Sequence, residues 1–148
     1  MRSVVVGVGN PILGDDAIGL QIAKRLKGRV NADVKETAAG GMELAEEIAN
    51  YDLAIIIDSV RGTDAGKVEE IDIREYGGSA VGHDVDFPTA YKTLEKYVKM
   101  PEVRILGVSI GKVELGAGLS DRVTDVIRPV SRKVKKILEK KADAAFVH

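Results

Sequence analysis

Residues 4–19 read VVVGVGNPILGDDAIG, an apolar run that ends in a glycine-rich loop with two adjacent acids, Asp15 and Asp16. The run is typical of a strand buried on both faces. Apolar residues recur at helical spacing after Asp16, and Asp15 is placed to serve as the N-cap of that helix. A strand, a tight loop and a helix in this order predict the first unit of an α/β domain.

Strands and helices continue to alternate along the chain. Further strands are expected over 32–38, 53–58, 66–73 and 103–110. Further helices are expected over 40–50, from 86 to 98 and from 126 to 138, the last of them kinked or divided near Pro129 because proline removes a backbone donor. The pattern predicts one three-layer α/β domain over residues 1–148.

Composition narrows the function classes. The chain has 148 residues, a net charge of −1 and no cysteine. The charge gives no reason to expect a nucleic acid or an anionic membrane as partner. Without a signal peptide or a long apolar run, we expect a cytoplasmic protein. Any metal site must use oxygen and nitrogen ligands, because no thiolate is available.

Ligands of open α/β sheets bind beyond the carboxyl ends of the strands. Asp58 ends the most apolar strand, and His83 lies in the irregular stretch 74–86. Each has an ordinary structural reading, an Asx turn for Asp58 and a surface hydrogen bond for His83. Together with Asp16, they form a candidate metal site of two carboxylates and one imidazole.

The opening loop does not match a dinucleotide-binding loop. Gly7 and Gly9 fit G-x-G-x-x-G, but Ile12 occupies the third glycine position. A helix N-terminus attracts anions, and Asp15 and Asp16 would repel a pyrophosphate there. The loop favours a cation, which makes a nucleotide-binding module the weakest alternative.

These residues carry a family resemblance. The opening G-x-G-N-x-x-x-x-D-D-x-x-G, followed by GGMELAEEI, IIIDSV, a downstream GH and ILGVSIGKVELGAGLSDRV, resembles the [NiFe]-hydrogenase maturation endopeptidases over nearly the whole chain. The resemblance implies a five-stranded mixed sheet in the order 2-1-3-5-4 with strand 4 antiparallel. That order would bring Asp58 close to Asp16.

The resemblance also implies a function. Enzymes of this family remove a short C-terminal extension from the large-subunit precursor of a [NiFe] hydrogenase after nickel insertion. The positions that match the family's metal ligands are Asp16, Asp58 and His83.

Other positions carry over as hypotheses. Glu36, in ETAAGG, stands where the family has an acid before the second helix, usually within Asp-Gly-Gly-Thr, and we expect it as a candidate general base. We expect Asn10, Asp15, Gly40 and Gly41 to contact the substrate peptide.

The proposed ligands, Asp16, Asp58 and His83, indicate whether the protein itself selects the metal. Two carboxylates and an imidazole make a modest site with no intrinsic preference for nickel over copper. We therefore expect the nickel to arrive held by the substrate, other divalent ions being able to substitute, and the free protein to be a monomer. Two alternatives stay open, a non-proteolytic nickel-sensing chaperone and a general divalent-metal hydrolase.

Overall fold

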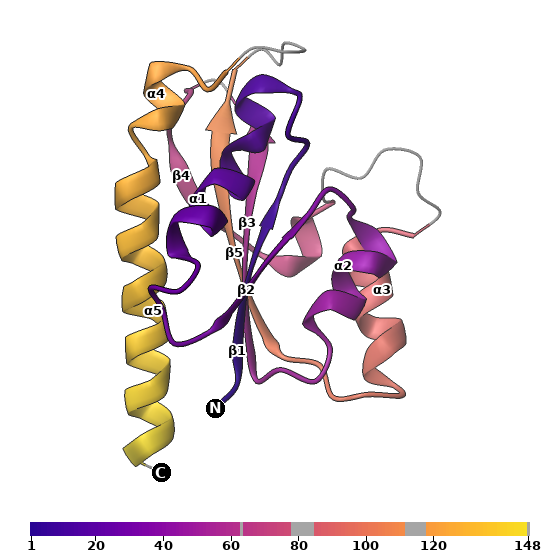
Figure 1. The fold of residues 1–148 in the computed structure, drawn as a ribbon. Coiled ribbons are helices and arrows are strands. Elements are labelled where there is room, and N and C mark those ends of the chain that lie inside the picture. The colour runs from indigo at the N-terminus through magenta and orange to yellow at the C-terminus, as the bar shows by residue number, and fades with distance from the viewer. Residues whose placement is uncertain (63, 78–84, 112–117, 148) are drawn as a thin grey trace.

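The computed structural model describes residues 1–62, 64–77, 85–111 and 118–147. Its five strands form one sheet in the order β2-β1-β3-β5-β4, with helices on both faces (Figure 1). The strands are β1 (Ser3–Val8), β2 (Asp33–Thr37), β3 (Leu53–Arg61), β4 (Val68–Ile71) and β5 (Glu102–Ile110). Only β4 runs antiparallel to its neighbour, β5. The strand order and the antiparallel fourth strand implied by the resemblance are confirmed.

Helices α1 and α5 cover one face of the sheet, and α2 and α3 cover the other (Figure 1). The helices are α1 (Ile18–Leu26), α2 (Gly41–Ile48), α3 (Phe87–Glu95), α4 (Asp121–Thr124) and α5 (Ile127–Val147). None of the described helices combines the length and the apolar content that crossing a membrane requires.

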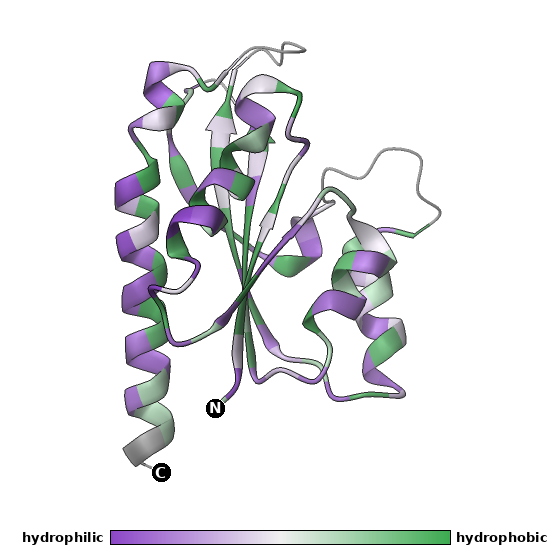
Figure 2. Cartoon of the chain, in the orientation of Figure 1, coloured by the Kyte–Doolittle hydropathy of each residue, from purple (hydrophilic) through white to green (hydrophobic). Residues whose placement is uncertain are grey.

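The core consists of two apolar layers, one on each face of the sheet. Ile55 and Ile57 of β3 belong to the layer under α1 and α5, whereas Ala54 and Ile56 belong to the layer under α2 and α3. Figure 2 shows the central strands as largely hydrophobic and the outer surface of α5 as rich in hydrophilic residues. A strand covered on both faces needs apolar residues at successive positions, which accounts for the unbroken runs in β1 and β3.

The starts of the first and the last helix test two expectations from the sequence. The first helix begins with a 3₁₀ turn, η1 (Gly14–Ala17), and Asp15 does not cap it, because Leu13 is the residue before the turn and supplies no side-chain hydrogen bond. The expected N-cap is therefore wrong. The division near Pro129 is confirmed: α4 ends before α5 begins, and Pro129 lies in the first turn of α5, where its missing N–H costs no helix hydrogen bond.

The β1–α1 unit depends on a close backbone approach between two glycines. A Cβ on Gly7 would lie 2.2 Å from the carbonyl oxygen of Gly19, and a Cβ on Gly19 would lie 2.4 Å from the carbonyl oxygen of Ile57. Gly19 therefore allows the close helix–strand packing that the third glycine of a dinucleotide fingerprint provides. This packing holds the β1–α1 loop against the ends of β1 and β3.

We expect Gly7→Ala to lower the free energy of unfolding by about 3 kcal/mol, because the added methyl group meets fixed backbone atoms. The measurement is urea unfolding followed by circular dichroism. The control is Gly111→Ala, where a Cβ would meet nothing within 4 Å. Equal stability of the two variants would contradict the close-packing explanation.

Candidate active site

Asp58 lies near the carboxyl end of β3 and is completely buried, with 0% of its surface exposed. Because side chains alternate along a strand, Asp58 follows Ala54 and Ile56 and faces the layer under α2 and α3. A carboxylate in such a place is costly unless hydrogen bonds compensate for its lost hydration.

Hydrogen bonds to both oxygens of Asp58 supply that compensation. The backbone N–H of Ser59 donates to Oδ1 at 2.8 Å, and the Tyr76 hydroxyl donates to Oδ2 at 2.6 Å. Burial and the nearby Asp58 carboxylate raise the pKa of Tyr76 far above its usual value. The phenol therefore stays protonated at physiological pH and remains a hydrogen-bond donor.

Ser59 connects Asp58 with Asp16. Its hydroxyl donates to Oδ1 of Asp16 at 2.6 Å, while its backbone N–H binds Asp58. Oδ2 of Asp16 accepts a hydrogen bond from the backbone N–H of Asn10 at 2.9 Å. One serine thus fixes two carboxylates from different elements, and the expected proximity of Asp16 and Asp58 follows from these contacts.

The third candidate ligand, His83, lies outside the described residues. Within the ranges that the structure describes, no three His, Cys, Asp or Glu side chains are grouped closely enough to hold a metal ion. The pair of Asp16 and Asp58 fits an ion in chemical terms, because each oxygen accepts a hydrogen bond and carboxylate oxygens keep further lone pairs. A nitrogen or oxygen ligand from elsewhere would have to complete the site.

Gly40 and Gly41 begin α2 close to the same edge of the sheet. Gly41 has a φ of +57°, and a Cβ there would lie 2.4 Å from the carbonyl oxygen of Val85. A side chain at position 41 would therefore suffer from both backbone strain and steric overlap. This geometry accounts for Gly41 without a substrate, so the substrate contact expected of the two glycines stays a prediction.

Asp15 points to a different partner from Asp16. Its carboxylate accepts hydrogen bonds from the backbone N–H of Ser120 at 2.7 Å and from the Ser120 hydroxyl at 2.8 Å. Ser120 is the residue that precedes α4. Asp15 therefore ties the β1–α1 loop to the start of α4, and the substrate contacts expected of Asp15 and Asn10 remain predictions.

Glu36 is not brought to the pair of carboxylates. On β2 it shares a face with Val34, which packs under α1 and α5, and its carboxylate lies 4.0 Å from the Lys24 ammonium of α1. Asp58 faces the opposite layer, against Tyr76. The sheet therefore separates Glu36 from Asp58, and the geometry does not favour Glu36 as general base.

Sequence reasoning missed Ser59 and Tyr76, the hydrogen-bond donors that position the two acids. Tyr76 was counted within an irregular stretch, yet it is 3% exposed and packs edge-on against Phe87 at 5.7 Å between ring centroids. The sequence signal for a buried Tyr76 is its place directly before Gly77 and Gly78. Ser59 follows Asp58 directly, where a hydroxyl after a buried acid could have suggested a positioning role.

A cavity of about 610 Å³ lies at the other end of the sheet, between the start of β1 and α5. Arg29, Lys135, Glu139 and Asp143 are among the residues that line it. It contains neither Asp16 nor Asp58. Because strand ends at the carboxyl edge carry the buried acids, the chemistry is assigned to that edge rather than to this cavity.

We expect Tyr76→Phe to lower the free energy of unfolding by about 2 kcal/mol, because a hydrogen bond to a buried carboxylate is lost. Tyr91→Phe is the matched control: the Tyr91 hydroxyl donates to the neutral carbonyl oxygen of Pro101 at 2.6 Å, and its loss should cost about 1 kcal/mol. Thermal and urea unfolding measure both variants. A smaller effect at Tyr76 than at Tyr91 would contradict a stabilising role of the Tyr76–Asp58 hydrogen bond.

No protein-family model matches the chain. The hydrogenase 2 maturation protease of Escherichia coli K12 is 39% identical over 64 residues, an alignment that covers 40% of this chain and only 39% of that protein. The chain thus matches about two fifths of the length of this curated relative.

Solved structures match the chain over more of its length. The hydrogenase maturating endopeptidase HybD of E. coli has a TM-score of 0.79 and 27% identity, covering 95% of this chain and 94% of that one. The [NiFe] hydrogenase maturation protease HycI of Thermococcus kodakarensis shares the fold, with a TM-score of 0.73, 22% identity and coverage of 93% and 92%. Together with the strand order and the opening motif, these similarities support the resemblance to the hydrogenase maturation protease family.

Proposed function

We propose that the protein is an endopeptidase that removes the C-terminal extension from the large-subunit precursor of a [NiFe] hydrogenase after nickel has been inserted. The observation that carries the proposal is the pair of Asp58 and Asp16, joined through Ser59 at the carboxyl edge of the sheet. The names of the similar proteins, hydrogenase maturation proteases, support the reaction class and the class of substrate.

In this proposal the nickel belongs to the substrate. Asp16, Asp58 and His83 would fill coordination positions that the precursor leaves open, so that only a loaded precursor is bound correctly. Nickel in that position supplies Lewis acidity to the scissile carbonyl. The protein's own contribution is to keep two carboxylates in fixed orientations, because preorganised groups need not rearrange during the reaction.

Hydrogen bonds around the pair support this role. Ser59 and Asn10 donate hydrogen bonds to Asp16, and Tyr76 donates one to Asp58, so both side chains are held in place. Such donors around metal-binding side chains commonly set the orientation of the ligand. The orientation of the buried Asp58 side chain is therefore set before the substrate arrives.

The test uses a nickel-loaded large-subunit precursor and the same precursor without nickel. We expect the wild-type protein to shorten only the loaded precursor, as read from its intact mass. Asp58→Asn and His83→Ala should slow this cleavage by roughly a hundredfold, the scale on which one charge-stabilising group acts. Circular dichroism checks that each variant is folded.

Glu36→Gln is the matched control, and we expect it to retain most of the cleavage rate. Glu36 is an acid on β2, which is separated from β3 by β1; its side chain is 33% exposed, lies on the other face of the sheet and is 4.0 Å from the Lys24 ammonium. An exposed ion pair of this kind contributes about 1 kcal/mol or less. A loss of cleavage as large as that of Asp58→Asn would restore Glu36 as the general base.

Other results would replace the proposal. Binding of the loaded precursor without a change in mass would indicate a nickel-sensing chaperone. Equal cleavage of loaded and nickel-free precursor would contradict recognition of the metal. Hydrolysis of small esters or phosphates without the precursor would indicate a general divalent-metal hydrolase.

A further inference from the structure

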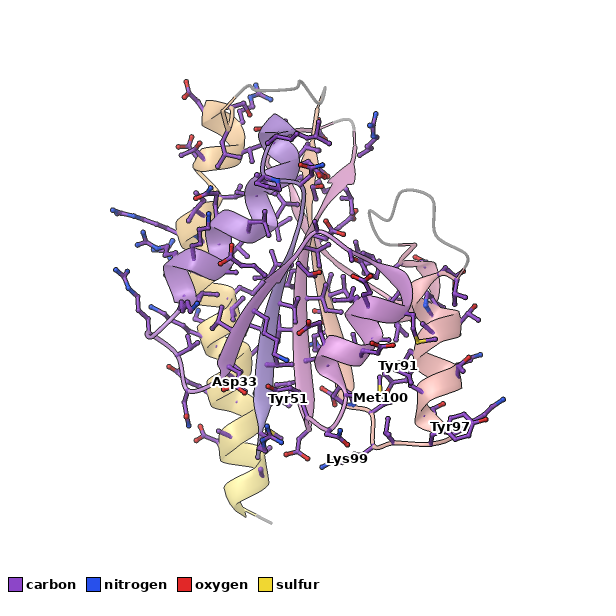
Figure 3. The ribbon with its side chains drawn as sticks, turned by 45° about the vertical axis from the view of Figure 1, so that its right-hand side comes forward. Asp33, Tyr51, Tyr91, Tyr97, Lys99 and Met100 are labelled. Carbon is purple, nitrogen blue, oxygen red and sulfur yellow. The ribbon has the colours of Figure 1, made fainter. Side chains whose placement is uncertain are left out.

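The tip of the β1–α1 loop exposes an aliphatic side chain beside the candidate site. Ile12 is 58% exposed, and its neighbour Pro11 is exposed as well. In the described part of the chain, the other large hydrophobic side chains with comparable exposure are Met1, Tyr97 and Val98. Tyr97 projects from the loop after α3, at the lower right of Figure 3. Ile12 is thus the exposed aliphatic residue of the loop that carries Asp16.

Hydrogen bonds within the loop hold this tip in one conformation. The side-chain oxygen of Asn10 accepts from the N–H of Ile12 at 3.1 Å, and the carbonyl oxygen of Asn10 accepts from the N–H of Leu13 at 3.2 Å. The proline ring at position 11 restricts the backbone further. The exposure of Ile12 therefore belongs to an ordered turn, and an ordered apolar group loses little entropy when a partner covers it.

The tip is also connected to Asp16. The N–H of Asn10 donates to Oδ2 of Asp16, and the N–H of Asp16 donates to the carbonyl oxygen of Leu13 at 3.0 Å. At the base of the loop, a Cβ on Gly9 would lie 2.2 Å from the carbonyl oxygen of Asp16, so the two backbones are in contact. The position of Ile12 is therefore fixed relative to the carboxylate that faces Ser59.

We propose that Pro11 and Ile12 dock an apolar segment of the protein substrate next to its metal-bearing segment. This inference rests on the proposed function, since the occupant is the precursor engaged at Asp16 and Asp58. A macromolecule that reaches Asp16 must approach the loop that carries the tip, and covering Ile12 removes apolar surface from water. Docking at the tip contributes to affinity whether or not nickel is present, whereas Asp58 contributes only through the metal.

The experiment separates docking from metal recognition. Isothermal titration calorimetry measures the Kd of wild type, Ile12→Ser and Asp58→Asn for the nickel-loaded and the nickel-free precursor. We expect Ile12→Ser to weaken binding of both forms by roughly tenfold, as expected for losing one buried aliphatic contact. Asp58→Asn should weaken binding of the loaded form only. In cleavage assays, Ile12→Ser should raise KM of the loaded precursor with little change in kcat.

Tyr97→Ser is the matched control, because it also removes an exposed apolar side chain but on the loop after α3. It should leave both Kd values at the wild-type level. Equal Kd values for wild type and Ile12→Ser, with cleavage intact, would overturn docking at the tip and leave the proposed function standing. If the wild-type protein neither bound nor cleaved either precursor, the proposed function would fail, and this inference with it.

Discussion

The burial of the Asp58 carboxyl group is the constraint on which the candidate site depends. A carboxylate at the end of an apolar strand costs several kcal/mol unless donors surround it. Donors come from Ser59 on the same strand and from Tyr76, which follows β4 by way of the short turn η2 (Ile73–Glu75). The Tyr76 phenol thus connects the turn after β4 with β3. Without the hydrogen bond from Tyr76, the lost hydration of the Asp58 side chain would be less well offset, and the folded state would be less stable.

The fold could be predicted largely from the sequence because both faces of the sheet are covered. Burial on both faces demands unbroken apolar runs, and β1 and β3 show them. The strand order came from the family resemblance, since patterning alone does not choose among parallel orders. The 3₁₀ turn at Gly14–Ala17 was not predicted, because the apolar spacing after Asp16 fits either kind of helix start.

Prediction of the site was limited by partners that are distant in sequence. Asp15 looked like a helix cap, but Ser120, 105 residues later, donates to it. Tyr76 and Asp58 are 18 residues apart, and no spacing rule connects them. Glu36 aligned with an acid of the family, yet the alternation of side chains along β2 turns it toward Lys24. One residue of strand register decides which face an acid occupies, and motif alignment does not report it.

Asp58 and Asp16 differ in burial and in how firmly their hydrogen bonds hold them. Asp58 is fully buried, and a tyrosine that cannot ionise at physiological pH donates to it, so its orientation is set before any ligand binds. Asp16 is only half-buried, and its partners are a hydroxyl, which can rotate, and a loop amide. Oδ2 of Asp16 accepts its hydrogen bond from the backbone N–H of Asn10, which belongs to the exposed loop. The single Asp16 carboxylate therefore connects the β1–α1 loop, through Asn10, with the end of β3, through Ser59.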